Sequence, residues 1–576
     1  MYLFHPLLTK YEDLDGESRA ILKCTIDWFE AKGKERLTAE DRKAEWYDDF
    51  VTFLAENQIF ARLYTPSTVG GERYKWNTAR ISAFYELCGF YGLSYWYAAQ
   101  VTSLGLGPIW MSRNEDLRNQ AFEYLKAGEL FAFALSEKEH GADIYSSEMR
   151  LVKQSDGTYL ANGSKYYIGN ANKARMICVF GVEAESKEYV WFVVDAAHPS
   201  FHLEKNVIHN QAYVAAFDLI DYPITQKEIL HLGRPAWDAA LNTVNLNKYN
   251  LGWGSIGICT HALYEAINHA ANRRLFDHYV TDFPHIQQLF LKAWTRLLAM
   301  RLFTDRSLDY LRVASLEDRR YLLYNALVKM KVTREGEQVI NDLWDVISAK
   351  GFEKDTFFNI ASRDIRGLPK LEGTVHVNMA LVMKFIPNYF FNSKTYPSIA
   401  KQKQDIDDAF VFAQGPAKGL SRVQFHDFRE AYQLYDSLNV KLFWEQIQVF
   451  QESLMMASPN AEQQKDIDFL LTAGELFTLI VYGQLILEQA QLMDLNPVIV
   501  DQIFELLIED FSCYALDFYH KPSATEKQLE YAQKMIKRPH YSPERREQIW
   551  HEQVLQLKGS YEMSPRGQRS MATVSG

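Results

Sequence analysis

Two short segments of the chain hold residues of the kind that enzymes use. In one of them, Glu372 precedes Gly373 and Thr374 at the end of a loop. A Gly-Thr pair in that place is typical of a helix N-terminus, and the pattern predicts a helix over 375–385. Glu372 would then lie just outside this helix, with its side chain free to face a cavity. Carboxylates are among the groups that enzymes use to move protons.

The other segment is Leu135-Ser-Glu-Lys-Glu-His-Gly-Ala-Asp143, between a helical region and a region of short strands. Ser136 and Gly141 would let backbone N–H groups come close to a ligand, because glycine lets the chain approach and turn. Considered alone, the segment is more simply interpreted as a polar connector.

Other kinds of site are not indicated. The sequence has no zinc signature, Ser–His–Asp elbow, P-loop or CxxC pair, and its 15 histidines show no HExxH-like clustering, so we expect no metal site. Gly252, Gly254 and Gly257 fit a dinucleotide fingerprint as text. That fingerprint needs a strand directly before it, whereas the preceding residues predict a helix. We therefore attribute these glycines to close helix packing.

The elements that must position these segments follow from the hydrophobic pattern. Residues 1–128 are expected to be helical, with apolar residues at helical spacing over 18–31, 41–58 and 76–100. Residues 129–236 predict a compact antiparallel β domain. Its strands are expected over 176–182 and 189–194, and its hairpin turns at Asp156-Gly157 and Asn162-Gly163.

Helical spacing returns after the β domain. Residues 237–392 predict a helical bundle that carries Glu372, and residues 393–576 predict an additional C-terminal helical domain. The helices of this last part are expected over 434–456, 467–492, 497–518 and 526–537. We expect the last dozen residues to be disordered. The order of elements excludes an alternating βαβ chain, so the predicted fold class is α+β, predominantly α.

Composition limits the class of protein. The chain has 576 residues, 47% apolar and 23% charged, which is ordinary for a soluble protein of three or four domains. A net charge of −11 gives no reason to expect nucleic acid as a partner. The five cysteines are scattered as free thiols would be, and no secretory signal is visible at the N-terminus. The most apolar run, 476–487, is too short to span a bilayer. We therefore expect a cytoplasmic protein.

Four sequence elements resemble the acyl-CoA dehydrogenase family, in the family's order and spacing, over residues 30–390. They are Ser136-Glu137 with Gly141-Ala142-Asp143, Lys165-Tyr-Tyr167-Ile168-Gly169-Asn170, Arg273-Arg-Leu-Phe276, and Arg363-Asp364 ahead of Glu372-Gly-Thr. The region after residue 390 resembles the extra C-terminal helical domain of long-chain members, including Gln414-Gly-Pro-Ala-Lys-Gly419.

The resemblance implies an FAD-dependent enzyme that converts a medium- to long-chain fatty acyl-CoA into a trans-2-enoyl-CoA in fatty acid β-oxidation. Glu372 would be the catalytic base, and Lys248 and Gly373 would bind substrate. The residues that would hold the flavin are Leu135, Ser136, Gly141, Ala142, Tyr167, Gly169, Arg273, Phe276 and Thr374.

The resemblance also implies partners. Arg273 and Phe276 would reach a flavin bound mainly by a neighbouring subunit, which implies a homodimer or homotetramer. An electron-transferring flavoprotein would accept the electrons. The C-terminal domain looks like an oligomerisation element or a site of peripheral membrane contact.

The chain departs from the family pattern at several positions. Ala142 replaces the usual Ser, Gly169 replaces a Thr, and Lys248 replaces an Arg. Asn247 stands where one branch of the family carries its base and cannot serve as one. The stretch with Ser348-Ala349 replaces a Gly-Gly pair that contacts the neighbouring flavin.

Two alternatives share this resemblance. An acyl-CoA oxidase has the same fold and base but passes its electrons to oxygen. A non-catalytic flavoprotein or assembly factor on the same scaffold would explain the altered Ser348-Ala349 stretch, although retention of Glu372 and Lys248 argues against it.

Overall fold

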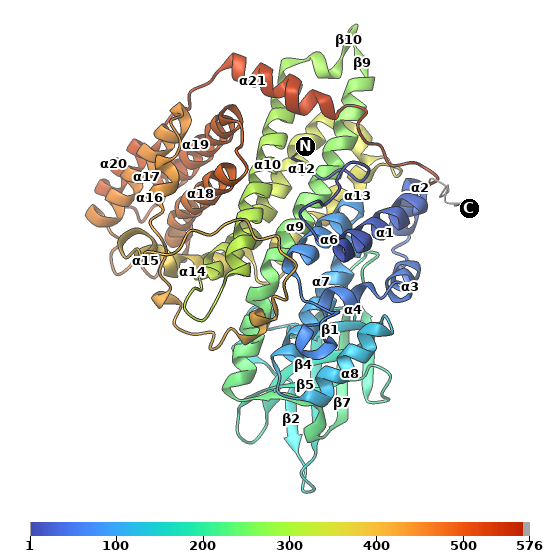
Figure 1. Ribbon diagram of the computed structural model, residues 1–576. Helices are drawn as coiled ribbons and strands as arrows, with labels where there is room; N and C mark the ends of the chain where they lie inside the picture. The colour runs from blue at the N-terminus through green and yellow to red at the C-terminus, as the bar shows by residue number, and fades with distance from the viewer. Residues whose placement is uncertain (1, 568–576) are drawn as a thin grey trace.

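The computed structural model describes residues 2–567, and Figure 1 shows their arrangement. Helices dominate, a large β-sheet lies at one end, and a small hairpin projects from the opposite end. This α+β layout, predominantly α, confirms the predicted fold class. The disorder predicted for the last dozen residues falls mostly beyond residue 567, outside the described range.

The N-terminal region is helical, as predicted. Its helices are α1 (Gly16–Lys32), α2 (Lys34–Arg42), α3 (Asp48–Glu56), α4 (Ile59–Tyr64), α5 (Ser67–Gly70), α6 (Thr78–Tyr91), α7 (Leu93–Met111) and α8 (Glu115–Lys126). The single helix predicted over 41–58 is wrong, because Ala44 adopts a left-handed φ of 50° between α2 and α3. The one predicted over 76–100 is also two helices, because α6 ends at Gly92, whose N–H bonds to the carbonyl of Cys88.

The β-sheet has the order β6-β7-β3-β2-β4-β5-β8, with β1 beside β4. Its strands are β1 (Leu130–Ala134), β2 (Arg150–Lys153), β3 (Tyr159–Gly169), β4 (Ala174–Glu183), β5 (Tyr189–Val194), β6 (Phe201–Asn206), β7 (Val214–Ile224) and β8 (Ile229–Leu232). The sheet is mixed rather than purely antiparallel as predicted, because β1 and β2 both pair with β4 in parallel.

The two predicted hairpin turns have different outcomes. Asp156-Gly157 lies in the β2–β3 hairpin, as predicted. The prediction for Asn162-Gly163 is wrong, because both residues lie inside β3, where pairing with β7 shifts between Ala161 and Gly163. Gly163 has a φ of 143°, and a Cβ there would lie 2.9 Å from the Cα of Met149. Glycine is needed at this bulge because the neighbouring strand passes so close.

Helix α9 (Arg234–Asn272) has 39 residues and forms the axis of the bundle. Its three fingerprint-like glycines lie against other helices, as predicted. A Cβ on Gly257 would meet the carbonyl oxygen of Glu86 at 2.1 Å, and one on Gly254 would meet the indole of Trp96 at 2.9 Å. The glycines therefore let α6 and α7 pack closely on α9, and the residues directly before them are helical rather than a strand.

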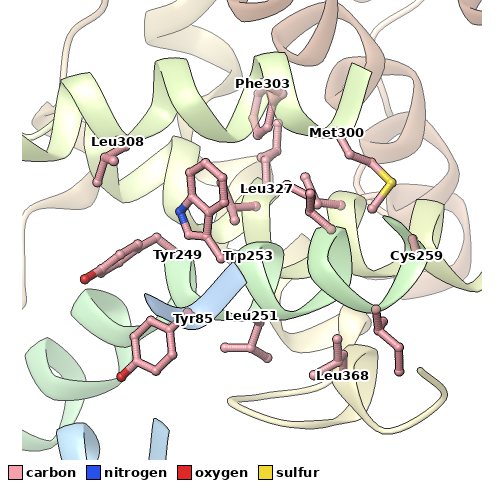
Figure 2. Close-up of a cluster of buried hydrophobic side chains, with 14 of the residues drawn as sticks. Tyr85, Tyr249, Leu251, Trp253, Cys259, Met300, Phe303, Leu308, Leu327 and Leu368 are labelled. Carbon is pink, nitrogen blue, oxygen red and sulfur yellow. The ribbon is translucent and has the colours of Figure 1, made fainter. Parts of the chain in front are cut away.

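The rest of the bundle packs around α9. Its helices are α10 (Pro284–Arg312), α11 (Tyr321–Leu327), α12 (Thr333–Ile347), α13 (Phe357–Asp364), α14 (Val375–Val382) and α15 (Ile386–Phe391). A π-helical turn, Val328–Val332, joins α11 to α12. Figure 2 shows the apolar core at this place, where Trp253 of α9, Phe303 of α10 and Leu327 of α11 gather. This packing fixes the segments that approach the catalytic candidate.

In the C-terminal region, α16–α20 form a group of helices beside the bundle, and α21 lies across the end of the bundle near α10 (Figure 1). The helices of this region are α16 (Arg429–Gln433), α17 (Leu438–Met456), α18 (Ile467–Leu492), α19 (Pro497–Tyr519), α20 (Glu526–Met535) and α21 (Pro543–Ile549). Within residues 2–567, α18 alone is long and apolar enough to cross a membrane, by length and composition. The apolar stretch of α18 is therefore longer than the run 476–487, which the sequence predicted to be too short to span a bilayer. Its apolar stretch is 83% buried against α10, α14 and α19, as in a core helix.

Candidate active site

Glu372 lies between a 3-10 turn, Leu368–Lys370, and the N-terminus of α14. Thr374 caps that helix, since its hydroxyl accepts a hydrogen bond from the N–H of Val377. Glu372 therefore stands outside the helix, where the sequence places it. Its φ of 52° and the φ of 83° at Gly373 are both left-handed, so the loop turns sharply at the carboxylate. The residue is partly exposed.

Three separate elements bring polar groups to the Glu372 carboxylate. They are α7 with Gln100, α9 with Lys248, and the π-helical turn with Lys329. Burial raises the pKa of Glu372 to about 7, because the charged form is poorly solvated, while the Gln100 hydrogen bond and the two ammonium charges oppose that rise. A carboxyl with this pKa can both take up and release a proton near neutral pH.

Lys248, the predicted substrate-binding residue, is buried on α9 and donates to the side chain of Asn245 at 3.0 Å. Burial lowers its pKa to about 8, and the charge of Glu372 acts in the opposite direction. The structure thus brings Lys248 and Glu372 together. Asn247 beside it is held in a buried polar network, where it accepts from the hydroxyl of Ser103 at 2.7 Å.

Tyr97 connects the Glu372 site to the β-sheet. Burial raises its pKa well above the usual range, and the negative charge of Glu372 adds to this rise. On its other side, Tyr97 packs against Gly169 at the end of β3. A Cβ on Gly169 would lie 2.7 Å from the Tyr97 ring, 2.8 Å from its hydroxyl and 2.7 Å from a methyl group of Val101. Glycine is therefore required at 169, and the tyrosine that packs on this strand end also feels the charge of the carboxylate.

The predicted flavin-binding residues of the β domain form one group at the ends of β1 and β3. The carbonyl of Leu135 accepts from the Lys165 ammonium at 3.0 Å, and the carbonyl of Ser136 accepts from the N–H of Tyr166 at 3.1 Å. Tyr167 has a left-handed φ of 64° and is 58% exposed, and its ring meets that of Tyr166 edge-on, with 4.7 Å between the ring centroids. A flat exposed ring beside a partly exposed serine suits a planar ligand.

Glu137 has a structural duty in this group. Its carboxylate pairs with Lys165 at 2.8 Å and accepts hydrogen bonds from Ser147 and from the N–H of Glu148. The pair ties the segment after β1 to β3. Gly141 and Ala142 follow in an exposed turn, where a Cβ on Gly141 would meet nothing within 4 Å. The room at this turn comes from its exposure, so Gly141 is not required by any neighbour.

Arg273 and Phe276 lie far from all of these residues. Arg273 precedes, and Phe276 lies in the turn of, the small hairpin of β9 (Arg274–Leu275) and β10 (His278–Tyr279), beyond the far end of α9 (Figure 1). The 25 residues from Lys248 to Arg273 span about 37 Å along a helix with a rise of 1.5 Å per residue. Phe276 is 88% exposed with a φ of 52°. These two residues therefore cannot join the Leu135–Tyr167 group within one chain.

Sequence reasoning missed three residues at this site, Tyr97, Gln100 and Lys329. Lys329 follows the apolar run Tyr321–Val328, and a lysine on a buried helical face needs a partner. A charged lysine next to apolar residues on one helical face is a signal that the sequence alone contained. Tyr97 and Gln100 lie within an almost wholly buried helix, so nothing in their spacing sets them apart.

Comparisons with known proteins point to one family. The family model for the acyl-CoA dehydrogenase middle domain matches residues 132–211, and the model for the C-terminal domain of the same family matches residues 237–386. The 3-(aryl)acrylate reductase of Clostridium sporogenes is 22% identical, over 63% of this chain and 96% of its own. The short-chain specific acyl-CoA dehydrogenase of Megasphaera elsdenii is 24% identical, over 62% of this chain and 94% of its own.

One similar solved structure extends over nearly the whole chain. The acyl-CoA dehydrogenase of Bacillus anthracis, solved as a complex with FAD, has a TM-score of 0.75 and 17% identity, and the match covers 95% of this chain and 96% of that one. The fold of the C-terminal region is therefore shared as well as that of the bundle and the sheet.

Proposed function

This chain belongs to the acyl-CoA dehydrogenase family, and from that premise we propose that it is an FAD-dependent dehydrogenase with Glu372 as its base. The observation that carries the proposal is the position of Glu372. Its carboxyl group, with a pKa of about 7, acts by its charge on Tyr97, and Tyr97 packs on the strand end that carries Gly169 and Tyr167.

The residues at the strand ends fit a flavin. Tyr167 offers an exposed ring for stacking, and Ser136 is partly exposed beside it. FAD bound there by Leu135, Ser136, Tyr167 and Gly169 would supply the hydride acceptor. Gly141, Ala142 and Thr374 are further candidates for contacts with it. Arg273 and Phe276 would serve the flavin of a neighbouring subunit in a homodimer or homotetramer, since their own chain's site is out of reach.

Glu372 would remove the proton from the α-carbon of the bound thioester. An N–H group of the Glu372-Gly373 loop, hydrogen-bonded to the thioester oxygen, would stabilise the negative charge that develops there by about 3 kcal/mol. Lys248 and Lys329 favour the ionised form of the base before reaction. Tyr97 and Gln100 help to exclude water around it.

The pH dependence follows from the pKa of Glu372. Only the ionised carboxylate can accept the α-proton, and its pKa is about 7. We expect the rate of flavin reduction to rise by about tenfold per pH unit below pH 7 and to level off above it. Stopped-flow measurement of the flavin absorbance between pH 5 and 9 checks this. A flat profile across pH 7 would show that another group sets the rate.

The substrate is proposed as a medium- to long-chain fatty acyl-CoA of β-oxidation, by analogy with long members of the family. A second class, aryl-substituted acyl thioesters, is supported by the similarity to a 3-(aryl)acrylate reductase and to a subunit of a caffeyl-CoA reductase complex.

An electron-transferring flavoprotein is the proposed electron acceptor, and the cytoplasm the proposed location. The C-terminal helices are proposed to support oligomerisation or peripheral membrane contact. An acyl-CoA oxidase would have the same base but would consume oxygen, so oxygen uptake during turnover separates the two activities. A non-catalytic flavoprotein would keep its flavin oxidised with every thioester.

Anaerobic titration tests the proposal directly. The FAD-loaded protein is titrated with butyryl-, octanoyl-, palmitoyl- and 3-phenylpropionyl-CoA while the oxidised flavin band is followed. We expect complete loss of the band with at least one thioester, and the most effective one identifies the substrate class. If no thioester reduces the flavin, the proposed dehydrogenation is refuted.

A further inference from the structure

Lys329 is a fully buried lysine in the π-helical turn between α11 and α12. An ammonium group in a protein interior costs several kcal/mol unless it is paired or hydrogen-bonded. Among residues 2–567, Lys329 has no carboxylate within salt-bridge distance. π-Helical turns are rare and occur often at functional sites. A lysine placed in this way needs an explanation other than the stability of the core.

The hydrogen bonds of Lys329 supply that explanation. Its ammonium donates to the carbonyl of Pro369 at 2.7 Å and to the carbonyl of Gly373. These two carbonyls flank Glu372, three residues before it and one residue after it. One side chain thus holds both ends of the short loop that carries the catalytic base.

The backbone of that loop needs such support. Glu372 has a φ of 52°, a left-handed conformation that costs a residue with a Cβ about 1–2 kcal/mol, and Gly373 follows with a φ of 83°. Strained positions persist only where their surroundings fix them. The carbonyl of Gly373 has two donors, Lys329 and the amide of Asn378 at 3.0 Å. Lys329 bonds the loop at two backbone carbonyls, those of Pro369 and Gly373, whereas Lys370 within the loop pairs with Glu337 of α12 through its side chain, at 2.8 Å.

The charge of Lys329, like its hydrogen bonds, supports Glu372 in the role of a base. The titratable groups around Lys329 are Glu372, Lys248 and Lys370. Burial and the two other lysines lower the pKa of Lys329 to about 7, whereas Glu372 opposes that change. In return, the positive charge of Lys329 lowers the pKa of Glu372. The ammonium therefore keeps more of the base ionised than burial alone would allow.

We propose that Lys329 is a positioning residue that clamps the Glu372 loop and keeps a positive charge beside its carboxylate. The part of this inference that concerns catalysis rests on the proposed function of Glu372. The clamp itself does not, because its bonds lie entirely within the protein. The two parts can therefore be tested separately.

The same π-helical turn offers a matched control. Lys331 is also buried, but it pairs with Glu335 at 2.5 Å, and Glu335 pairs in turn with Arg296 at 2.6 Å. This network faces α10 and the C-terminal helices instead of the Glu372 loop. In Lys331→Met, Arg296 remains as the partner of Glu335. This variant removes a buried charge from the turn without touching the clamp.

Amide hydrogen exchange of the full chain without substrate tests the clamp. Lys329→Met removes both hydrogen bonds, so the bonded amides at the two ends of the loop, the N–H of Lys370 and the N–H of Asn378, should exchange about tenfold faster or more, while α10 stays protected. Lys329→Gln keeps an uncharged donor and should show a smaller increase. Lys331→Met should leave these amides unchanged. Exchange in the loop that is the same for wild type and Lys329→Met would overturn the clamp.

Flavin reduction by the thioester chosen in the titration tests the charge. In Lys329→Met and Lys329→Gln alike, the apparent pKa of the rate profile should rise by about one pH unit or more. Lys331→Met should keep the wild-type profile. If both Lys329 variants hold FAD and keep the wild-type pKa, the electrostatic role is overturned. If wild type itself reduces no flavin, the proposed function fails, and the exchange result still decides the clamp.

Discussion

Glu372→Gln should leave a folded protein that binds FAD but reduces it about a hundredfold more slowly or worse, the low end of general-base contributions. The amide has the shape of the carboxyl and can keep the hydrogen bond with Gln100, but it cannot accept the α-proton. Single-turnover absorbance measurements at pH 8 give the rate. Flavin content after gel filtration reports whether the site is intact.

Glu353→Gln is a matched control, because Glu353 forms an ion pair with Lys350 at 3.0 Å on the surface, with its side chain 60% exposed. It should keep wild-type turnover. A Glu372→Gln protein that keeps more than about a tenth of the wild-type rate would remove Glu372 from the role of base.

The same substitution should alter stability with pH. Folding raises the pKa of Glu372 from 4.5 to about 7, so the folded state holds this proton more tightly than the unfolded state. The resulting stabilisation is fully present below pH 4.5 and is lost as the pH rises through 7. Glutamine cannot ionise, so the variant should gain about 1–2 kcal/mol relative to wild type at pH 8 and little at pH 4.5, after allowance for partial exposure.

Gly169→Thr should abolish FAD binding or weaken it severely. A Cβ at this strand end would lie 2.7 Å from the Tyr97 ring, too close for carbon atoms, so Tyr97 or β3 must move. Overpacking of this kind costs about 1–3 kcal/mol, and here the displacement reaches both the flavin candidates and the neighbour of Glu372. Titration of the apoprotein with FAD, followed by flavin fluorescence, measures the loss.

Removal of the two side chains that crowd Gly169 should reverse that effect. In Gly169→Thr with Tyr97→Ala and Val101→Ala, the threonine occupies space that the ring and the Val101 methyl group have left, and FAD binding should return to within about tenfold of the protein with Tyr97→Ala and Val101→Ala alone. The protein with Tyr97→Ala and Val101→Ala is the control for the loss of the two side chains. FAD binding that is equal in Gly169→Thr and wild type, or that stays lost in the triple variant, would show that these side chains and Gly169 do not share this space.

The sequence was sufficient to predict the bounds of those helices whose hydrophobic pattern is long and regular. Helices such as α18 and α19 follow the predicted bounds because an apolar stripe over more than 20 residues has one periodic interpretation. Shorter features were less predictable. The break at Ala44 depends on one left-handed residue, and the parallel pairing of β1 with β4 depends on contacts between distant segments.

The part of the candidate site that lies within one segment of the sequence, Glu372 and the helix cap after it, was predictable. Glu372 lies outside α14 because Thr374 caps the helix, and a cap is a local signal. The groups that surround Glu372 come from α7, α9 and the π-helical turn, so their meeting is a property of the bundle. The need for glycine at position 169 could not be predicted either, because the space beside it is filled by Tyr97, more than 70 residues earlier in the chain.

A crystal structure of the protein with FAD and a thioester that cannot be oxidised would test the central claim most directly. We expect the Glu372 carboxyl to lie about 3–3.5 Å from the α-carbon, with the flavin ring on the opposite face of the substrate beside Tyr167 and Gly169. A carboxyl that points into solvent, or a flavin bound elsewhere on the chain, would contradict it.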